Sequence, residues 1–177
     1  MFSCSACNSL ASPIARQAMI MSYSELQFIL AEARERGFIT TGTAADYYRN
    51  GIQASFDYYD ERLEVGGYHA IKDAVEADAL YYAQPEVAYV GTPAQRLEKI
   101  AMQKWIANFF SGLEAWFDWR RTGVPQITPG PGAVQATVPV RFMYPSGVQA
   151  LNKENYNAAI QRQGPDNLTT RVWWDVQ

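Results

Sequence analysis

The sequence predicts a mainly α-helical fold, built from tetratricopeptide-like helical hairpins with long irregular loops and a C-terminal extended tail. Helix-capping patterns begin at Ser22, Thr43 and Thr92, and apolar residues recur at helical spacing in the segments that follow. Between residues 122 and 152 the chain is rich in proline and glycine, which is typical of irregular structure. We therefore expect four main helices and no sheet larger than a hairpin.

The first helix is expected at residues 23–36 and the second at 43–59, joined as an antiparallel hairpin. Ser22 and Glu25 form a capping box before the first helix, and Gly37 is suited to end it. Gly51 indicates a close approach of another helix, since glycine costs about 1 kcal/mol relative to alanine inside a helix. The expected inward residues are Tyr23, Leu26, Ile29, Leu30 and Ala33 in the first helix, and Ala44, Tyr47, Tyr48, Gly51, Ile52, Ser55, Phe56 and Tyr59 in the second.

The pattern is weaker between residues 60 and 91, where we expect a helix at 68–80. A strong helix start follows, with Thr92 as N-cap and Pro93 in the first turn, and predicts a helix at 93–110. Its expected buried residues are Leu97, Ile100, Ala101, Trp105 and Phe109.

Gly112 permits a bend before a further helix at 113–121, which is dense in tryptophan and phenylalanine. Burying each such side chain is worth roughly 1.5–3 kcal/mol, so this helix is expected to pack in the core. A short helix at about 153–161, closed by Gly164, is expected before the tail.

The composition is that of a globular protein, with 177 residues, 48% of them hydrophobic, and a net charge of −3. The largest cluster of basic residues is Arg120-Arg121, so the basic surface expected of a nucleic-acid-binding protein is missing. No apolar run reaches the roughly 18 residues of a membrane-spanning helix.

Residues 114–125 resemble the EAW-x-DWRRTG-x-P signature of the SusD/RagB family of outer-membrane nutrient-binding lipoproteins. Segments 23–37, 47–59, 103–107 and 138–160 and the final Trp-Trp-Asp resemble family motifs too, although Gly147-Val148-Gln149 departs from the usual acidic position. The resemblance implies that residues 21–177 are the C-terminal helical domain of a longer protein, after a poorly structured segment 1–20. A chain that lacks such a partner is expected to expose an apolar patch larger than a few hundred Å².

The same resemblance implies a non-catalytic glycan- or nutrient-binding component of an outer-membrane uptake system. Its expected partners are an oligosaccharide or polysaccharide and a TonB-dependent, SusC-like transporter, with the protein exposed at the cell surface and without a cofactor. Family members are exported and lipid-anchored through a cysteine. The N-terminus MFSCSACNSL shows neither the charged nor the apolar region of a signal peptide, and here the sequence departs from the family.

Metal and catalytic motifs are sparse. Cys4-x-x-Cys7 is compatible with a redox pair or half a zinc site, but zinc needs about four ligands and the single histidine, His69, is distant in sequence. Glu114 and Asp118 share a helix face as a pair of glycosidase acids would. Ion pairing with the adjacent arginines is the simpler interpretation, so we expect no metal site and no catalytic residues, with a glycoside hydrolase as the weaker alternative.

Aromatic residues are the best candidates for binding, because sugar rings stack on flat aromatic faces. Most are expected in the core, among them Trp105, Trp116 and Trp119. The candidates for ligand contact lie in the turn-rich stretch 60–91 and are Tyr68, Tyr81, Tyr82 and Tyr89. The alternative function is a helical-repeat scaffold for protein–protein interaction.

Overall fold

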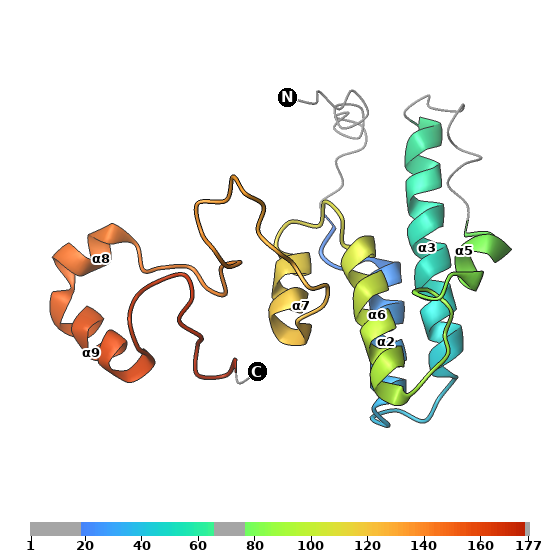
Figure 1. Cartoon of the computed structure of the whole chain (residues 1–177), viewed down its shortest axis with the longest axis horizontal. Helices are drawn as coiled ribbons and strands as arrows, with labels where there is room; N and C mark the ends of the chain where they lie inside the picture. The colour runs from blue at the N-terminus through green and yellow to red at the C-terminus, as the bar shows by residue number, and fades with distance from the viewer. Residues whose placement is uncertain (1–18, 66–76, 176–177) are drawn as a thin grey trace. The chain divides into compact units, whose positions relative to one another are not determined.

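The computed structural model describes residues 19–65 and 77–175 (Figure 1). The described residues contain helices and no strand, which confirms the mainly α-helical fold class. The helices are α2 (Tyr23–Glu35), α3 (Ala44–Val65), α5 (Ala79–Ala83), α6 (Pro93–Ala107), α7 (Glu114–Thr122), α8 (Ser146–Leu151) and α9 (Lys153–Gln163). Two compact units divide between Ala115 and Trp116, and each is described by itself. The predicted boundary near residue 20 stays a prediction.

The predicted caps are present at all three helix starts. The Ser22 hydroxyl accepts a hydrogen bond from the Glu25 amide at 2.9 Å, and Thr43 does the same for Asp46 at 3.1 Å. Thr92 forms the complete capping box that the sequence predicts. At the end of α2, Gly37 takes a φ of +78°, and Phe38 donates its amide to the Ala33 carbonyl oxygen at 2.8 Å.

In the first unit, α2 packs between α3 and α6 (Figure 1). The start of α2 meets the end of α6, where Glu25 and Lys104 lie 3.8 Å apart, and its end meets the start of α6 through Glu35 and Arg96. Helix α2 therefore runs antiparallel to α6, as it does to α3. The core consists of Phe28, Ala31, Tyr48, Ile52, Val87 and Ile100.

Gly51 has the role that the sequence predicts for it. A Cβ atom at this position would lie 2.9 Å from the Phe28 ring, closer than real contacts allow. The Ser24 hydroxyl also donates to the Gly51 carbonyl oxygen, at 2.7 Å. The contact between α2 and α3 thus depends on a glycine opposite an aromatic ring.

The prediction of the inward face of α2 was wrong for three of its five residues, since Leu30 and Ala33 are half-buried. Tyr23, Leu26 and Ile29 are 62%, 40% and 36% exposed, and the buried positions are Ser24, Glu25, Gln27, Phe28 and Ala31. Both sets follow helical spacing, so periodicity alone does not choose between them. The small residues Ser24 and Ala31 allow close approach on the second face, where the Phe28 ring packs over Gly51.

Two helix ends also differ from expectation. Helix α3 continues to Val65 instead of ending at 59, because Asp60-Glu61-Arg62-Leu63 are compatible with a helix. Helix α6 ends at Ala107 instead of 110, with Asn108 as its C-cap, and Phe110 takes a φ of +63°. Phe109, predicted to be buried, is 59% exposed as a result.

In the second unit, the proline-rich chain after α7 is fixed by polar contacts. Buried Arg141 forms an ion pair with Asp166 at 2.9 Å, and the Val140 amide donates to the Leu168 carbonyl oxygen at 2.8 Å. Helix α9 runs to Gln163, two residues beyond the predicted end, and closes at Gly164 as predicted. Helix α8 is a short helix in a stretch expected to be irregular. Across the described residues, none of the helices has the length and apolar character needed to span a membrane.

Candidate functional site

Three of the four predicted ligand-contacting tyrosines lie on or after α5, and Tyr68 lies outside the described residues. Helix α5 begins where the Asp78 carboxylate accepts the Tyr81 amide at 2.7 Å. The chain then turns back onto α3, where the Tyr48 hydroxyl donates to the carbonyl oxygen of buried Val87 at 2.8 Å. These contacts hold Tyr81, Tyr82 and Tyr89 against the core of the first unit.

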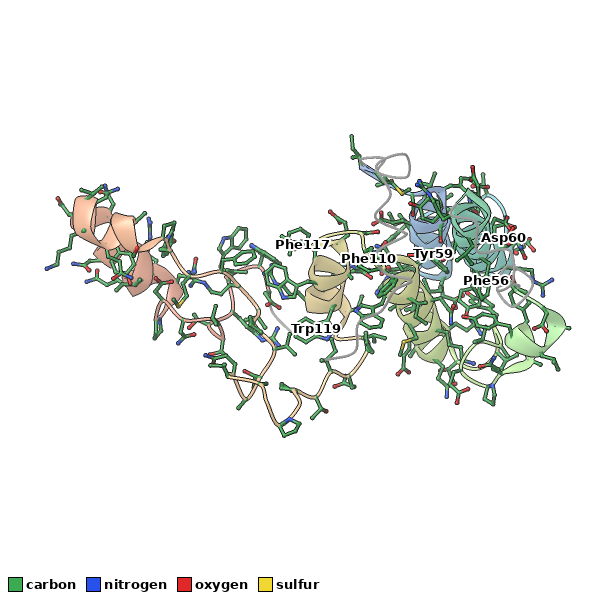
Figure 2. The ribbon with its side chains drawn as sticks, turned by 90° about the horizontal axis from the view of Figure 1, so that it is seen from above. Phe56, Tyr59, Asp60, Phe110, Phe117 and Trp119 are labelled. Carbon is green, nitrogen blue, oxygen red and sulfur yellow. The ribbon has the colours of Figure 1, made fainter. Side chains whose placement is uncertain are left out.

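The hydroxyl groups of Tyr81 and Tyr89 are already engaged. Tyr81 donates to the Gln103 side-chain oxygen at 2.8 Å, and its ring lies edge-on to Phe56, with 4.9 Å between centroids. Tyr89 donates to Glu35 at 2.7 Å. Figure 2 labels Phe56 and also Tyr59, which comes from the same helix α3. Both tyrosines are half-buried, so each side chain is only partly open to a ligand.

The Glu35 carboxylate connects α2, α6 and Tyr89. Arg96 donates to it from Nε at 2.9 Å and from Nη2 at 2.5 Å. These hydrogen bonds hold the pKa of Glu35 below its ordinary value, although its burial acts in the opposite direction. Burial is also the main reason why the pKa of the Tyr89 hydroxyl is raised.

The hydroxyl group of Tyr82 differs from those of Tyr81 and Tyr89 in its hydrogen bonding. The Arg49 guanidinium lies 5.4 Å from its ring centre, and the half-buried ring packs against the core. Its hydroxyl oxygen is buried and has no hydrogen-bond partner in the described part of the chain. Burial raises the pKa of this hydroxyl.

The second unit contains an aromatic cluster around α7. Trp116 donates its indole N–H to the Pro139 carbonyl oxygen at 2.7 Å, and Trp119, labelled in Figure 2, donates to that of Pro125 at 3.0 Å. The buried Arg120 guanidinium lies 4.6 Å from the Trp116 ring centre and 4.8 Å from that of Trp174. Trp116 and Trp119, expected in the core, are half-buried and join the helix to the long loop, while Arg120 joins it to the tail.

The most exposed tryptophan follows this cluster and was not among the predicted ligand contacts. Trp173 is 84% exposed, and the neighbouring Trp174 is also exposed beside Arg120. The sequence suggested these positions only as a family motif. A pair of adjacent tryptophans at a chain end gives no periodic signal, so exposure had to come from the structure.

The glycosidase alternative requires two carboxylates that are open to solvent. Glu114 is exposed, but Asp118 is buried and forms an ion pair with Arg121 at 2.8 Å. This is the ion pairing that the sequence suggested. Among residues 19–65 and 77–175, no group of three or more metal-ligating side chains is found, and Cys4, Cys7 and His69 lie outside these ranges.

Comparison with known proteins gave one family and several solved structures. The model of the SusD-like family described as starch-binding and associating with the outer membrane matches residues 2–145. A SusD-like protein from Bacteroidetes AC2a is 32% identical, with a TM-score of 0.76, over 90% of this chain and 31% of its own. No curated protein sequence matched the chain.

Two further structures are described by their ligand. A chitin-binding protein is 37% identical over 88% of this chain and 33% of its own, with a TM-score of 0.64. A chitin-binding SusD homolog from Flavobacterium johnsoniae is 32% identical over 89% and 36%, with a TM-score of 0.66. This chain thus spans about a third of the length of these structures. With its family motifs, its helical fold and a family match over most of its length, the chain belongs to the SusD-like family of proteins associated with the outer membrane.

Proposed function

We propose that this chain contributes to glycan binding in an outer-membrane nutrient-uptake system, with chitin-type oligosaccharides as the first ligands to test. The observation that carries this proposal is the similarity to two structures described as chitin-binding, at 37% and 32% identity. The family model, described as starch-binding, supports the same ligand class.

The proposed contacts are aromatic faces. Exposed Trp173 offers the largest open ring, and a sugar ring stacks on such a face through its C–H groups. Tyr68, Tyr81, Tyr82 and Tyr89 remain the other proposed contacts. For Tyr81 and Tyr89 the contact would use the ring, because the hydroxyl groups already donate to Gln103 and Glu35.

We expect binding without turnover. The buried, ion-paired state of Asp118 supports a non-catalytic role, because a general acid or nucleophile must reach the glycosidic bond. In the uptake system, a TonB-dependent, SusC-like transporter is the proposed partner, and the outer-membrane association of the family supports it.

Ligand-observed NMR or calorimetry with chitin and starch oligosaccharides tests the proposal. We expect an affinity no tighter than millimolar, which corresponds to about 4.1 kcal/mol, because stacking on a few rings is weak. Trp173→Ala, Tyr81→Ala and Tyr82→Ala should weaken binding, whereas Phe38→Ala, at an exposed ring between α2 and α3, should not. Absence of binding to every glycan, or hydrolysis of any of them, would contradict the proposal.

A further inference from the structure

Arg120 is a buried arginine whose hydrogen-bond donors are not satisfied by the described part of the chain. The residue is 9% exposed, and its guanidinium lies over the rings of Trp116 and Trp174, 4.6 Å and 4.8 Å from their centres. Its Nε is buried and has no hydrogen-bond partner among the described residues. The N–H donors of a guanidinium lie in its own plane, so contacts with ring faces do not supply the acceptors that they need.

The charge of Arg120 is also unbalanced within the second unit. Residues 116–175 contain six lysines and arginines but four aspartates and glutamates, a surplus of two positive charges in a chain whose net charge is −3. All three aspartates of this range pair with other arginines: Asp118 with Arg121 at 2.8 Å, Asp166 with Arg141 at 2.9 Å, and Asp175 with Arg171 at 2.6 Å. A cation in this state attracts an anionic group.

The rings beside Arg120 indicate which kind of anion fits. Trp174, which contacts the guanidinium, is 53% exposed, and the adjacent Trp173 is 84% exposed. Such open indole faces stack on the C–H faces of sugar rings. A ligand that combines a sugar ring with a carboxylate therefore matches both features, whereas a small free anion would use only the guanidinium.

We propose that Arg120 and the open faces of Trp173 and Trp174 form a subsite for acidic glycans, in which the guanidinium binds the carboxylate of a uronic acid residue. A carboxylate presents two acceptor oxygens to the paired donors of a guanidinium, and such charge-assisted hydrogen bonds are about twice as strong as neutral ones. Chitin and starch are neutral, so the inference adds a ligand class to the proposed glycan binding, on which it rests.

The test compares tetragalacturonic acid with its methyl ester, which has the same sugar rings but no charge. Calorimetry at low ionic strength should give an affinity about tenfold higher for the acid, because only the acid forms charge-assisted hydrogen bonds. In NMR spectra, the indole N–H signals of Trp173 and Trp174 should shift more with the acid than with the ester. This readout locates the site in the unchanged protein. Acetate alone should shift these signals less, because it has no ring to stack.

Two substitutions separate the role of Arg120 from a general effect of charge. Arg120→Gln should reduce the ratio of the two affinities to about one. Arg162→Gln, which removes a positive charge from an exposed position of α9, is the matched control and should leave the ratio unchanged. Circular dichroism checks that each variant is folded. If Arg120→Gln does not fold, the indole signals of the unchanged protein decide, and signals that the acid does not shift overturn the inference.

The failure of this inference is distinct from that of the proposed function. Equal binding of acid and ester, or a folded Arg120→Gln variant that still prefers the acid, would overturn the acidic subsite and leave glycan binding intact. Acetate that shifts the indole signals as strongly as the tetrasaccharide would also overturn it, since the sugar ring would then contribute nothing. If neither these ligands nor any neutral glycan binds, the proposed function fails, and the subsite fails with it.

Discussion

At the scale of single residues, Tyr81 and Tyr82 are neighbours with opposite hydrogen-bond states. Removing the Tyr81 hydroxyl leaves the oxygen of buried Gln103 without its donor, so Tyr81→Phe should cost about 0.5–1.5 kcal/mol of the free energy of unfolding. Tyr82→Phe removes a buried hydroxyl that has no partner in the described structure and should be neutral or stabilising. Urea denaturation compares the two variants. An equal loss in both would mean that the Tyr82 hydroxyl is paired, for example with a buried water.

The ion pair between Glu35 and Arg96 should make the stability of the fold depend on pH. Its pKa is lowered in the folded protein by the hydrogen bonds from Arg96, so the unfolded chain takes up a proton at higher pH than the folded one. The ionised carboxylate therefore stabilises the fold above its ordinary pKa of about 4.3, and this contribution is lost as the pH falls through the lowered folded value.

Glu35→Gln should consequently be less stable than the original at pH 7, and the difference should shrink below about pH 4. Denaturation in urea at several pH values measures the difference. Glu98→Gln, at an exposed position of α6, is the matched control for the loss of one negative charge and should change the free energy of unfolding at pH 7 by no more than about 0.5 kcal/mol. A difference for Glu35→Gln that stays constant with pH would refute the electrostatic explanation.

At the scale of elements, α7 is joined to the loop by its tryptophans. Trp119→Ala removes a partly buried ring and the hydrogen bond to Pro125, so we expect a loss near the lower end of the 3–5 kcal/mol range, about 3 kcal/mol. Trp173→Ala is the control, because its ring is exposed and its removal should change stability by no more than about 0.5 kcal/mol. If Trp119→Ala kept full stability and lost only ligand binding, Trp119 would belong to the binding site.

Contacts between elements also fix the loop around a departure from the family pattern. In the segment where the family has an acidic residue, this chain has Gly147-Val148-Gln149. Arg141, upstream of that segment, pairs with Asp166, which also accepts the Tyr144 amide at 3.2 Å. The carboxylate that holds the loop thus comes from beyond α9. It lies 25 residues after Arg141 in the sequence, too far for a short sequence motif to show the pairing.

At the scale of the whole molecule, the exposed apolar side of α2 should be detectable in solution. The folded chain should increase the fluorescence of a hydrophobic dye, because the dye binds to exposed apolar surface. Contiguous apolar patches above a few hundred Å² are rare on monomers, so the signal should exceed that of an ordinary monomeric protein. Leu26→Asp should reduce that signal without changing the circular dichroism of the helices, whereas Leu151→Asp, at an isolated exposed leucine, should reduce it less. A folded chain that does not bind the dye would contradict the exposure of this face.

The sequence by itself determined where three of the main helices begin and where α2 ends. The caps at Ser22, Thr43 and Thr92 join groups three residues apart, so the whole interaction is visible in a short stretch of sequence. The same holds for Gly37, whose conformation ends α2. The family was also recognisable, because its motif around α7 is contiguous.

Only the tertiary structure decided which faces are buried. Helix α2 has two stripes at helical spacing, and the choice between them depends on the fit of Phe28 over Gly51, 23 positions along the chain. Contacts between segments that are distant in sequence also decide which aromatic rings are exposed. Tyr81 and Tyr89 are engaged by partners on other helices, whereas Trp173 has none that covers its ring. Hydrogen bonds within one helical turn can be predicted from residues that are close in the sequence. Burial depends on the shapes of distant segments that only folding brings together.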